Sequence, residues 1–193
     1  MRAIASKARS KSAARSKTTS VHLLKVTLSY VEPPVWRRVA VPSHFTLERL
    51  HWVLQWVMGW ENSHMHAFRI GKRMYGNDPE SLDESKVTVG DVLPKKGSKA
   101  VYIYDFGDDW MHEVVVEQVG APDPKVNYPT CIEGQRACPP EDCGGPPGYE
   151  RLLETLADPE HDEHVEMKDW LGKKFNAEMF GLARVNRELK KVR

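Results

Sequence analysis

The patterned part of the chain opens with two segments in which apolar and polar residues alternate. Residues 22–31 place leucine, valine and tyrosine at every second position, and residues 35–41 run from Val35 to Val41 before Pro42. A period of two is typical of strands that bury one face. The Glu-Pro-Pro turn between the segments predicts that the two strands pair antiparallel.

The pattern then changes to the spacing of a helix. Between Thr46, which can cap a helix, and Gly59, which can end one, apolar residues recur three or four positions apart. Alternation returns beyond this helix, and residues 99–104 and 111–119 form the clearest hairpin pattern of the chain. Shorter strands are expected at residues 65–70 and 73–75, and one helical turn at residues 88–93.

The last part of the chain divides into a loop-like and a helical segment. Residues 120–148 are rich in proline and show no period, which indicates a long loop. The whole pattern predicts an α+β fold, in which helices cover one face of a mainly antiparallel sheet of hairpins and the C-terminal part is helical. A doubly wound parallel sheet is disfavoured, because strands and helices do not alternate. Helices are expected at residues 149–157, 161–171 and 177–192.

The charge of the chain is unevenly distributed. Residues 1–20 contain six basic residues and no acidic one, so residues 21–193, with 22 basic and 27 acidic residues, carry a formal charge of −5. The basic segment is predicted to be a disordered tail, and residues 21–193 are predicted to form a single domain. Three interpretations of the tail stay open: a solvated leader without function, a weak salt-sensitive contact with nucleic acid, or a transit-like presequence.

Two further features bear on where the protein works. No apolar stretch is long enough for a secretory signal or a membrane span, so no contact with a membrane is expected. The chain has three cysteines, an odd number, and all of them lie within residues 131–143. This grouping does not suggest disulfides distributed over the fold, and we expect a cytoplasmic protein.

The turn of the predicted hairpin carries the first candidate chemistry. Asp108 and Asp109 lie in this turn, and His112 and Glu113 follow on the next strand. Carboxylates and an imidazole suit a divalent cation that activates water. Because neighbours on a strand point to opposite faces, His112 with Asp108 or Asp109 is the favoured cluster. Glu113 or Glu141 is then the candidate general base. In the alternative interpretation, the aspartates only accept hydrogen bonds from backbone amides of the turn.

The three cysteines, together with two histidines, form the second candidate. Thiolates suit zinc, which takes four ligands in a tetrahedron. The cysteines are separated by six and four residues, and neither interval is the two-residue spacing of common zinc sites. Because three cysteines supply only three ligands, a histidine would supply the fourth: His112, His161 or His164. Small buried thiols, or one reactive thiol, are the alternatives. The candidate ligands of zinc or another divalent metal are Cys131, Cys138, Cys143, His161 and His164.

Aromatic and histidine side chains gather around the predicted first helix and its exit. They include Trp60 and His64, and they suit either a groove that recognises a peptide or a base, or a core of aromatic residues with polar tips. The Gly-Gly-Pro-Pro-Gly run at residues 144–148 is interpreted as a tight turn that starts a helix. Glu141 and Asp142, just before this run, can balance the positive end of that helix.

Four long motifs stand out in the middle of the chain. They are Val-Trp-Arg-Arg at residues 35–38, Met-Gly-Trp-Glu-Asn-Ser-His at 58–64, Tyr-Asp-Phe-Gly-Asp-Asp-Trp-Met-His-Glu at 104–113 and Cys-Pro-Pro-Glu-Asp-Cys-Gly-Gly at 138–145. Together they resemble the plasmid pRiA4b ORF-3-like family, over nearly all of the chain beyond the tail. The resemblance implies an uncharacterised protein that occurs with plasmids and mobile elements. Some members of that family are labelled transposon resolvases.

The residues do not support a recombinase. A serine recombinase needs an early nucleophilic serine with arginines around it, and a tyrosine recombinase needs a late tyrosine, whereas the last tyrosine here is Tyr149. We therefore favour a binding or accessory module that is not an enzyme and whose ligand is unknown. Its concave site would join residues 105–112, 60–64 and 138–148, with Trp60, His64, Asp105 and Trp110 as binding residues. The alternatives are a metal-dependent hydrolase or nuclease that uses residues 105–112, and nucleic-acid binding through residues 1–20.

Overall fold

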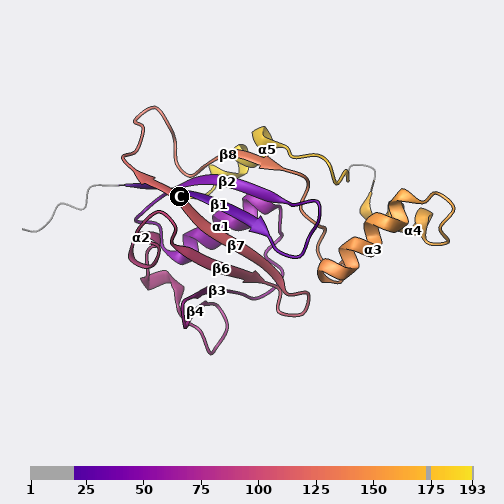
Figure 1. The fold of residues 1–193 in the computed structure, drawn as a ribbon, viewed down its shortest axis with the longest axis horizontal. Coiled ribbons are helices and arrows are strands. Elements are labelled where there is room, and N and C mark those ends of the chain that lie inside the picture. Colours follow the sequence, from indigo (N-terminus) through magenta and orange to yellow (C-terminus); the bar gives the residue numbers. More distant parts are fainter. Residues whose placement is uncertain (1–19, 173–174, 193) are drawn as a thin grey trace, which may run out of the picture.

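The computed structural model describes residues 20–172 and 175–192 of the 193-residue chain. Its eight strands form a single sheet (Figure 1). The strands are β1 (Val21–Leu28), β2 (Trp36–Pro42), β3 (His66–Ile70), β4 (Arg73–Gly76), β5 (Leu82–Asp83), β6 (Lys99–Tyr104), β7 (Trp110–Gly120) and β8 (Thr130–Gln135). The helices are α1 (Leu47–Met58), α2 (Val89–Val92), α3 (Gly145–Ala157), α4 (His164–Leu171) and α5 (Leu182–Leu189). The predicted basic tail lies outside the described residues, apart from Ser20.

The sheet has the strand order β5-β4-β3-β6-β7-β1-β2-β8. All neighbouring strands are antiparallel except β4 and β5, which are parallel. The predicted hairpins β1–β2, β3–β4 and β6–β7 are all present, and β1 joins the first hairpin to the last by pairing with β7. The prediction of an α+β fold with a mainly antiparallel sheet is confirmed.

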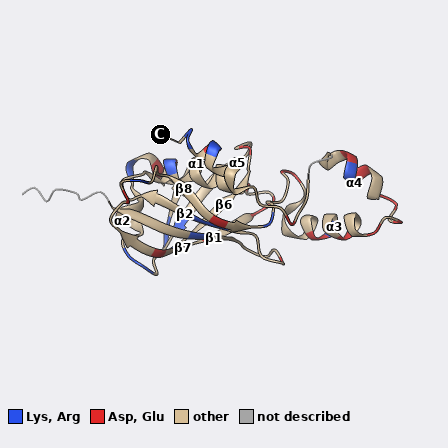
Figure 2. Cartoon of the chain, turned by 90° about the horizontal axis from the view of Figure 1, so that it is seen from above, with Lys and Arg blue, Asp and Glu red and all other residues tan. Residues whose placement is uncertain are grey.

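Helices α1 and α5 lie on the same side of the sheet (Figure 2). Helix α1 begins where the Thr46 side chain accepts a hydrogen bond from the Arg49 backbone N–H, and it ends at Gly59, whose φ of 101° favours glycine. The predicted apolar stripe of α1, which includes Leu50 and Leu54, is fully buried in the core. Each such leucine contributes about 2 kcal/mol through its burial, which fixes α1 on the sheet.

Helices α3 and α4 project beyond the end of the sheet (Figure 1). The two helices pack on each other, and the buried His164 at the start of α4 donates from Nδ1 to the Thr155 carbonyl oxygen of α3 at 2.9 Å. Helix α3 begins at Gly145, four residues earlier than predicted, because prolines suit the first turn of a helix. We call residues 141–171 the helical arm.

Strand β8 lies within residues 120–148, and our prediction of a loop is wrong for Thr130–Gln135. Strand β8 is at the edge of the sheet and pairs only with β2. Its outer side is covered by Asn186 of α5, whose side-chain amide accepts from the Cys131 backbone N–H at 2.8 Å and donates to the Cys131 carbonyl oxygen at 2.9 Å. These two contacts attach α5 to the edge of the sheet.

Two smaller observations complete the fold. Residues 77–86, between β4 and α2, contain the two-residue strand β5 and a 3₁₀ turn at Glu84–Lys86. Among the described residues, no helix combines the length and the apolar character that crossing a bilayer requires.

Candidate functional site

The loop after α1, the loop that leads into α3 and the turn between β6 and β7 meet at one place. The Gly144 backbone N–H, in the loop that leads into α3, donates to Asp108 Oδ2 of the turn at 3.2 Å. The Glu61 backbone N–H, in the loop that follows α1, donates to Glu141 Oε1 at 2.7 Å. The structure thus brings together the three segments that sequence reasoning expected to converge, although they are far apart in the chain.

His64 lies at this junction and faces three carboxylates. Its Nε2 atom is 3.1 Å from Asp142 Oδ1, 3.4 Å from Glu141 Oε2 and 3.6 Å from Asp105 Oδ2. We call these four residues the His64 cluster. In the part of the chain that the structure describes, His64, Asp105 and Asp142 are the only group of three metal-ligating side chains whose donor atoms all lie within 4.8 Å of one another.

The backbone is left-handed at three non-glycine positions around the cluster. The φ angles are 56° at Asn62, 58° at Asp105 and 56° at Asp142. Residues other than glycine disfavour the left-handed region, and among them asparagine and aspartate tolerate it best. Strained backbone positions of this kind concentrate at functional sites, where the surrounding structure holds them in place.

Tyr104, at the end of β6, supports the cluster. Its phenol donates to Glu141 Oε1 at 2.9 Å and accepts from the Ser63 backbone N–H at 2.9 Å. Burial, reinforced by the hydrogen bond to Glu141, raises the pKa of the Tyr104 phenol, so the phenol stays neutral and donates. Asp105 Oδ1 accepts from the Gly107 backbone N–H at 2.9 Å. Asp105 and Glu141 therefore each have one oxygen held by the fold and the other directed at His64.

The His64 cluster combines three acidic side chains with one imidazole. The side chains of Asp105 and Glu141 are only 11% and 14% exposed, whereas that of Asp142 is 73% exposed. Gathered carboxylates with little access to water are unfavourable unless a positive charge offsets them. One imidazole nitrogen and several carboxylate oxygens suit a first-row divalent cation such as Mn²⁺, Fe²⁺ or Zn²⁺. The exposed side of the cluster, at Asp142, would leave such a cation accessible to a ligand.

The predicted binding residues Trp60 and Trp110 lie in the core rather than in an open groove. They are 4% and 1% exposed, with ring centroids 5.4 Å apart. The Trp60 ring also lies 5.2 Å from that of Tyr104. These aromatic residues therefore fix the position of Tyr104 and, through it, of the cluster.

His112 is also part of the core. It donates from Nδ1 to the Tyr102 carbonyl oxygen at 3.2 Å, and its Nε2 atom accepts from the Trp60 indole N–H at 3.2 Å. Complete burial lowers the pKa of His112 to about 4, so the imidazole is neutral near pH 7. These bonds use both ring nitrogens, which leaves none for a metal.

The predicted grouping of His112 with Asp108 or Asp109 is not present in the structure. Alternation along β7 directs His112 to the face covered by helices, whereas Asp108 binds Gly144 and Asp109 is exposed in the turn. Glu113 points to the opposite face and pairs with Lys99 at 2.7 Å. Of the predicted catalytic residues, only Glu141 joins the His64 cluster.

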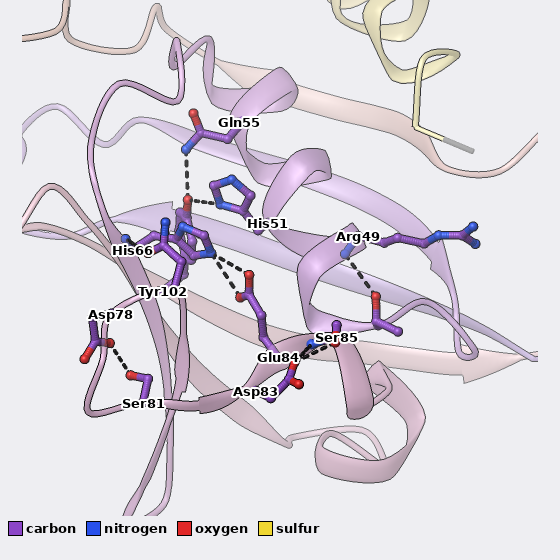
Figure 3. A network of polar contacts seen from close by, with 12 residues as sticks. Arg49, His51, Gln55, His66, Asp78, Ser81, Asp83, Glu84, Ser85 and Tyr102 are labelled. Atoms are coloured by element: carbon purple, nitrogen blue, oxygen red, sulfur yellow. Dashed lines mark hydrogen bonds and ion pairs between the residues drawn. The ribbon is translucent and has the colours of Figure 1, made fainter.

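A buried polar network joins α1, β3, β6 and the 3₁₀ turn at Glu84–Lys86 (Figure 3). The rings of His51 and His66 stack with centroids 3.5 Å apart. His51 accepts from the Tyr102 hydroxyl at 2.8 Å and donates to Asn62 Oδ1 at 3.0 Å, while His66 Nε2 lies 3.0 Å from both oxygens of Glu84. Burial, followed by the neighbouring His66, lowers the pKa of His51 to about 3. Sequence reasoning missed Glu84 and Tyr102, because the pairing of β3 with β6 and the placement of the 3₁₀ turn after β5 bring them to His66.

The cysteines and histidines predicted as zinc ligands do not form one site. Within the described residues, no thiol belongs to a group of three close metal-ligating side chains. Both histidines bond backbone atoms: His164 binds Thr155, as described above, and His161 Nδ1 accepts from the Glu163 backbone N–H at 3.1 Å. The predicted ligands that belong to no such group among the described residues are Cys131, Cys138, Cys143, His161 and His164.

The three thiols are expected to be unreactive in the native protein. Burial raises the pKa of Cys131 to about 11 and that of Cys143 to about 12, and it raises the pKa of Cys138 still further. Since only thiolates are nucleophilic, we expect a thiol-specific colorimetric reagent at pH 8 to react at least about 100-fold more slowly with native than with urea-unfolded protein. A native thiol that reacts as fast as the unfolded chain would contradict this arrangement.

Comparison with known proteins identifies relatives that match most of the chain. Residues 20–184 match the family described as plasmid pRiA4b ORF-3-like protein. The uncharacterised protein y4hQ of Sinorhizobium fredii is 43% identical over 159 residues, which cover 79% of this chain and 81% of that protein. The crystal structure of MM3350, a protein of unknown function from Methanosarcina mazei, has a TM-score of 0.80 and 37% identity, covering 86% of this chain and 97% of that one.

Proposed function

The chain belongs to the plasmid pRiA4b ORF-3-like protein family, and we propose that it is a binding module centred on a divalent cation held by the His64 cluster. The observation that carries this proposal is the approach of three carboxylates to one imidazole nitrogen, at 3.1 to 3.6 Å. In keeping with the family description, the module would be an accessory component of plasmids or mobile elements.

The lack of a hydrogen-bond partner for the His64 imidazole nitrogen Nε2, in the part of the chain that the structure describes, supports a cation in the His64 cluster. His64 Nε2 is buried and has no hydrogen-bond partner among the described residues, although three carboxylate oxygens surround it. A cation among these atoms would accept the nitrogen lone pair and neutralise the carboxylates together. The combination of one nitrogen donor with carboxylate oxygen donors favours Mn²⁺, Fe²⁺ or Zn²⁺ over Mg²⁺ and Ca²⁺, which prefer oxygen ligands alone.

A titration of the chelator-treated full chain with Mn²⁺ tests this proposal. We expect one saturable site per chain by calorimetry or electron paramagnetic resonance. His64→Ala or Asp105→Asn should weaken binding by about 100-fold, because each removes a ligand atom from a preformed site. Asp105→Asn leaves an oxygen for the Gly107 backbone N–H and suits a φ of 58°.

Asp109→Asn is the matched control. Asp109 belongs to the same turn, also has a left-handed φ of 54°, and is exposed outside the cluster. This substitution should leave the affinity for Mn²⁺ within about twofold of wild type, since the removed charge is screened by solvent. Equal affinities of all variants, or no saturable binding of Mn²⁺ and Zn²⁺, would contradict the proposal.

The same preparation separates binding from catalysis. Glu141 Oε2 lies beside His64 and could act as a general base on water bound to the cation. We expect the Mn²⁺-loaded protein not to hydrolyse a phosphodiester such as bis(p-nitrophenyl) phosphate. Turnover that disappears in Glu141→Gln while Mn²⁺ still binds would show instead that the module is a hydrolase.

A further inference from the structure

The helical arm carries a large excess of negative charge. Residues 141–171 contain ten acidic and two basic residues, a formal charge of −8, whereas residues 21–193 as a whole carry −5. The part of the domain outside the arm is therefore net positive. Acidic positions lie along both α3 and α4 of the arm (Figure 2). The arm thus presents an electrostatic surface distinct from that of the sheet.

A cavity of about 690 Å³ lies between α3 and α4. Its apolar wall is formed by Leu152, Met167 and Trp170, and Trp170 is 49% exposed although it is the largest side chain of the arm. The charged groups around this wall are mostly carboxylates. They are Asp142, Glu154, Asp158, Glu163 and Glu166, and among the described residues that line the cavity Arg151 is the one arginine or lysine.

Most acidic groups of this cavity have no lysine or arginine partner in the part of the chain that the structure describes. Within the described residues, Glu154, Glu163 and Glu166 form no ion pair with lysine or arginine. Like charges around one cavity repel each other, and a cationic ligand would relieve this repulsion. An anionic ligand, including a nucleic-acid phosphate, would add to it.

We propose that the cavity binds a lysine- or arginine-rich peptide segment of a partner protein. The aliphatic stem of a basic side chain would pack on Met167 and Trp170, and its charged end would meet the carboxylates. An arginine would gain further from the face of the Trp170 ring. This site is separate from the His64 cluster apart from Asp142, which belongs to both.

Binding of a dye-labelled peptide of alternating arginine and leucine to the full chain tests this proposal. The experiment is run with a chelator present, so that its result does not depend on a cation at the His64 cluster. We expect saturable binding by fluorescence anisotropy, and no binding of the peptide in which glutamate replaces arginine. Trp170→Ala should weaken binding about tenfold, because it removes the main apolar and cation–π contact.

Two triple variants distinguish a defined site from diffuse attraction. Glu154→Gln/Glu163→Gln/Glu166→Gln removes three charges that line the cavity, and we expect at least about tenfold weaker binding. The control Glu150→Gln/Glu160→Gln/Asp162→Asn removes three exposed charges of the same arm that do not line it, and should change affinity less than about threefold. Equal losses in both triple variants, or no saturable binding to the wild type, would overturn the proposal.

Discussion

Acidification from pH 7 to pH 4 is expected to lower the free energy of unfolding by about 6 kcal/mol through two buried histidines. In the folded protein, the pKa is about 4 for His112 and about 3 for His51, whereas an unfolded histidine has a pKa near 6.5. Between these values the unfolded chain binds protons that the folded protein excludes. The stability is therefore fully present above about pH 6.5 and is lost as the pH falls.

An effect of this size is comparable with the total stability of an ordinary domain, so we expect unfolding near pH 4. Urea unfolding at pH 7, 6, 5 and 4 measures the free energy directly. His112→Gln and His51→Asn should each be less stable at pH 7, because they disturb buried hydrogen bonds, yet each should lose about half of the pH dependence. An unfolding free energy that stays constant from pH 7 to pH 4.5 would show that the buried imidazoles accept protons in the folded state.

Gly145→Ala is expected to destabilise the protein by about 3 kcal/mol and to weaken cation binding by the His64 cluster. Gly145 has a φ of 68°, and an added Cβ atom would lie 2.5 Å from the Asp108 carbonyl oxygen. The neighbour is backbone of the β6–β7 turn, which cannot rotate away as a side chain can. The loop that contains Glu141 and Asp142 must therefore move away from the turn, and two carboxylates would leave His64.

Gly97→Ala separates this effect from ordinary backbone strain. Gly97 also has a positive φ, 83°, but an added Cβ atom there meets no other atom within 4 Å. We expect a cost of about 1 kcal/mol and unchanged Mn²⁺ affinity for this control. Thermal unfolding and Mn²⁺ titration of both variants provide the comparison. If Gly145→Ala is as stable as Gly97→Ala and binds Mn²⁺ as the wild type does, the close contact between loop and turn does not hold the cluster together.

Local patterns predicted most of the sheet and its main helix. The stripe between Thr46 and Gly59 predicts α1 because helix caps and the spacing of apolar residues depend on neighbours in the sequence. Strand β8 escaped prediction because its residues acquire strand structure by pairing with β2, about ninety residues earlier. A segment with prolines on both sides carries too little local signal to reveal such a pairing.

The sequence predicted which segments form the candidate site, but not which side chains of these segments contact each other. His64, Asp105 and Glu141 were each predicted as binding or catalytic residues, and they do lie together. Alternation indicated that His112 and Glu113 point to opposite faces, but it could not tell that helices cover the face of His112. Asp142 was interpreted as a partner of the α3 terminus, and its approach to His64 depends on a left-handed backbone that no residue type specifies.

The amide of Asn186 has a consequence for how this domain can recognise other molecules. By bonding both free backbone groups of Cys131, it occupies the place that a ninth strand would take at the β8 margin. The opposite margin is β5, only two residues long. An incoming chain therefore could not pair with Cys131, and β5 offers only two residues for main-chain pairing. We therefore expect recognition to use side chains at loop tips and between helices, where charge and shape rather than main-chain pairing would select a partner.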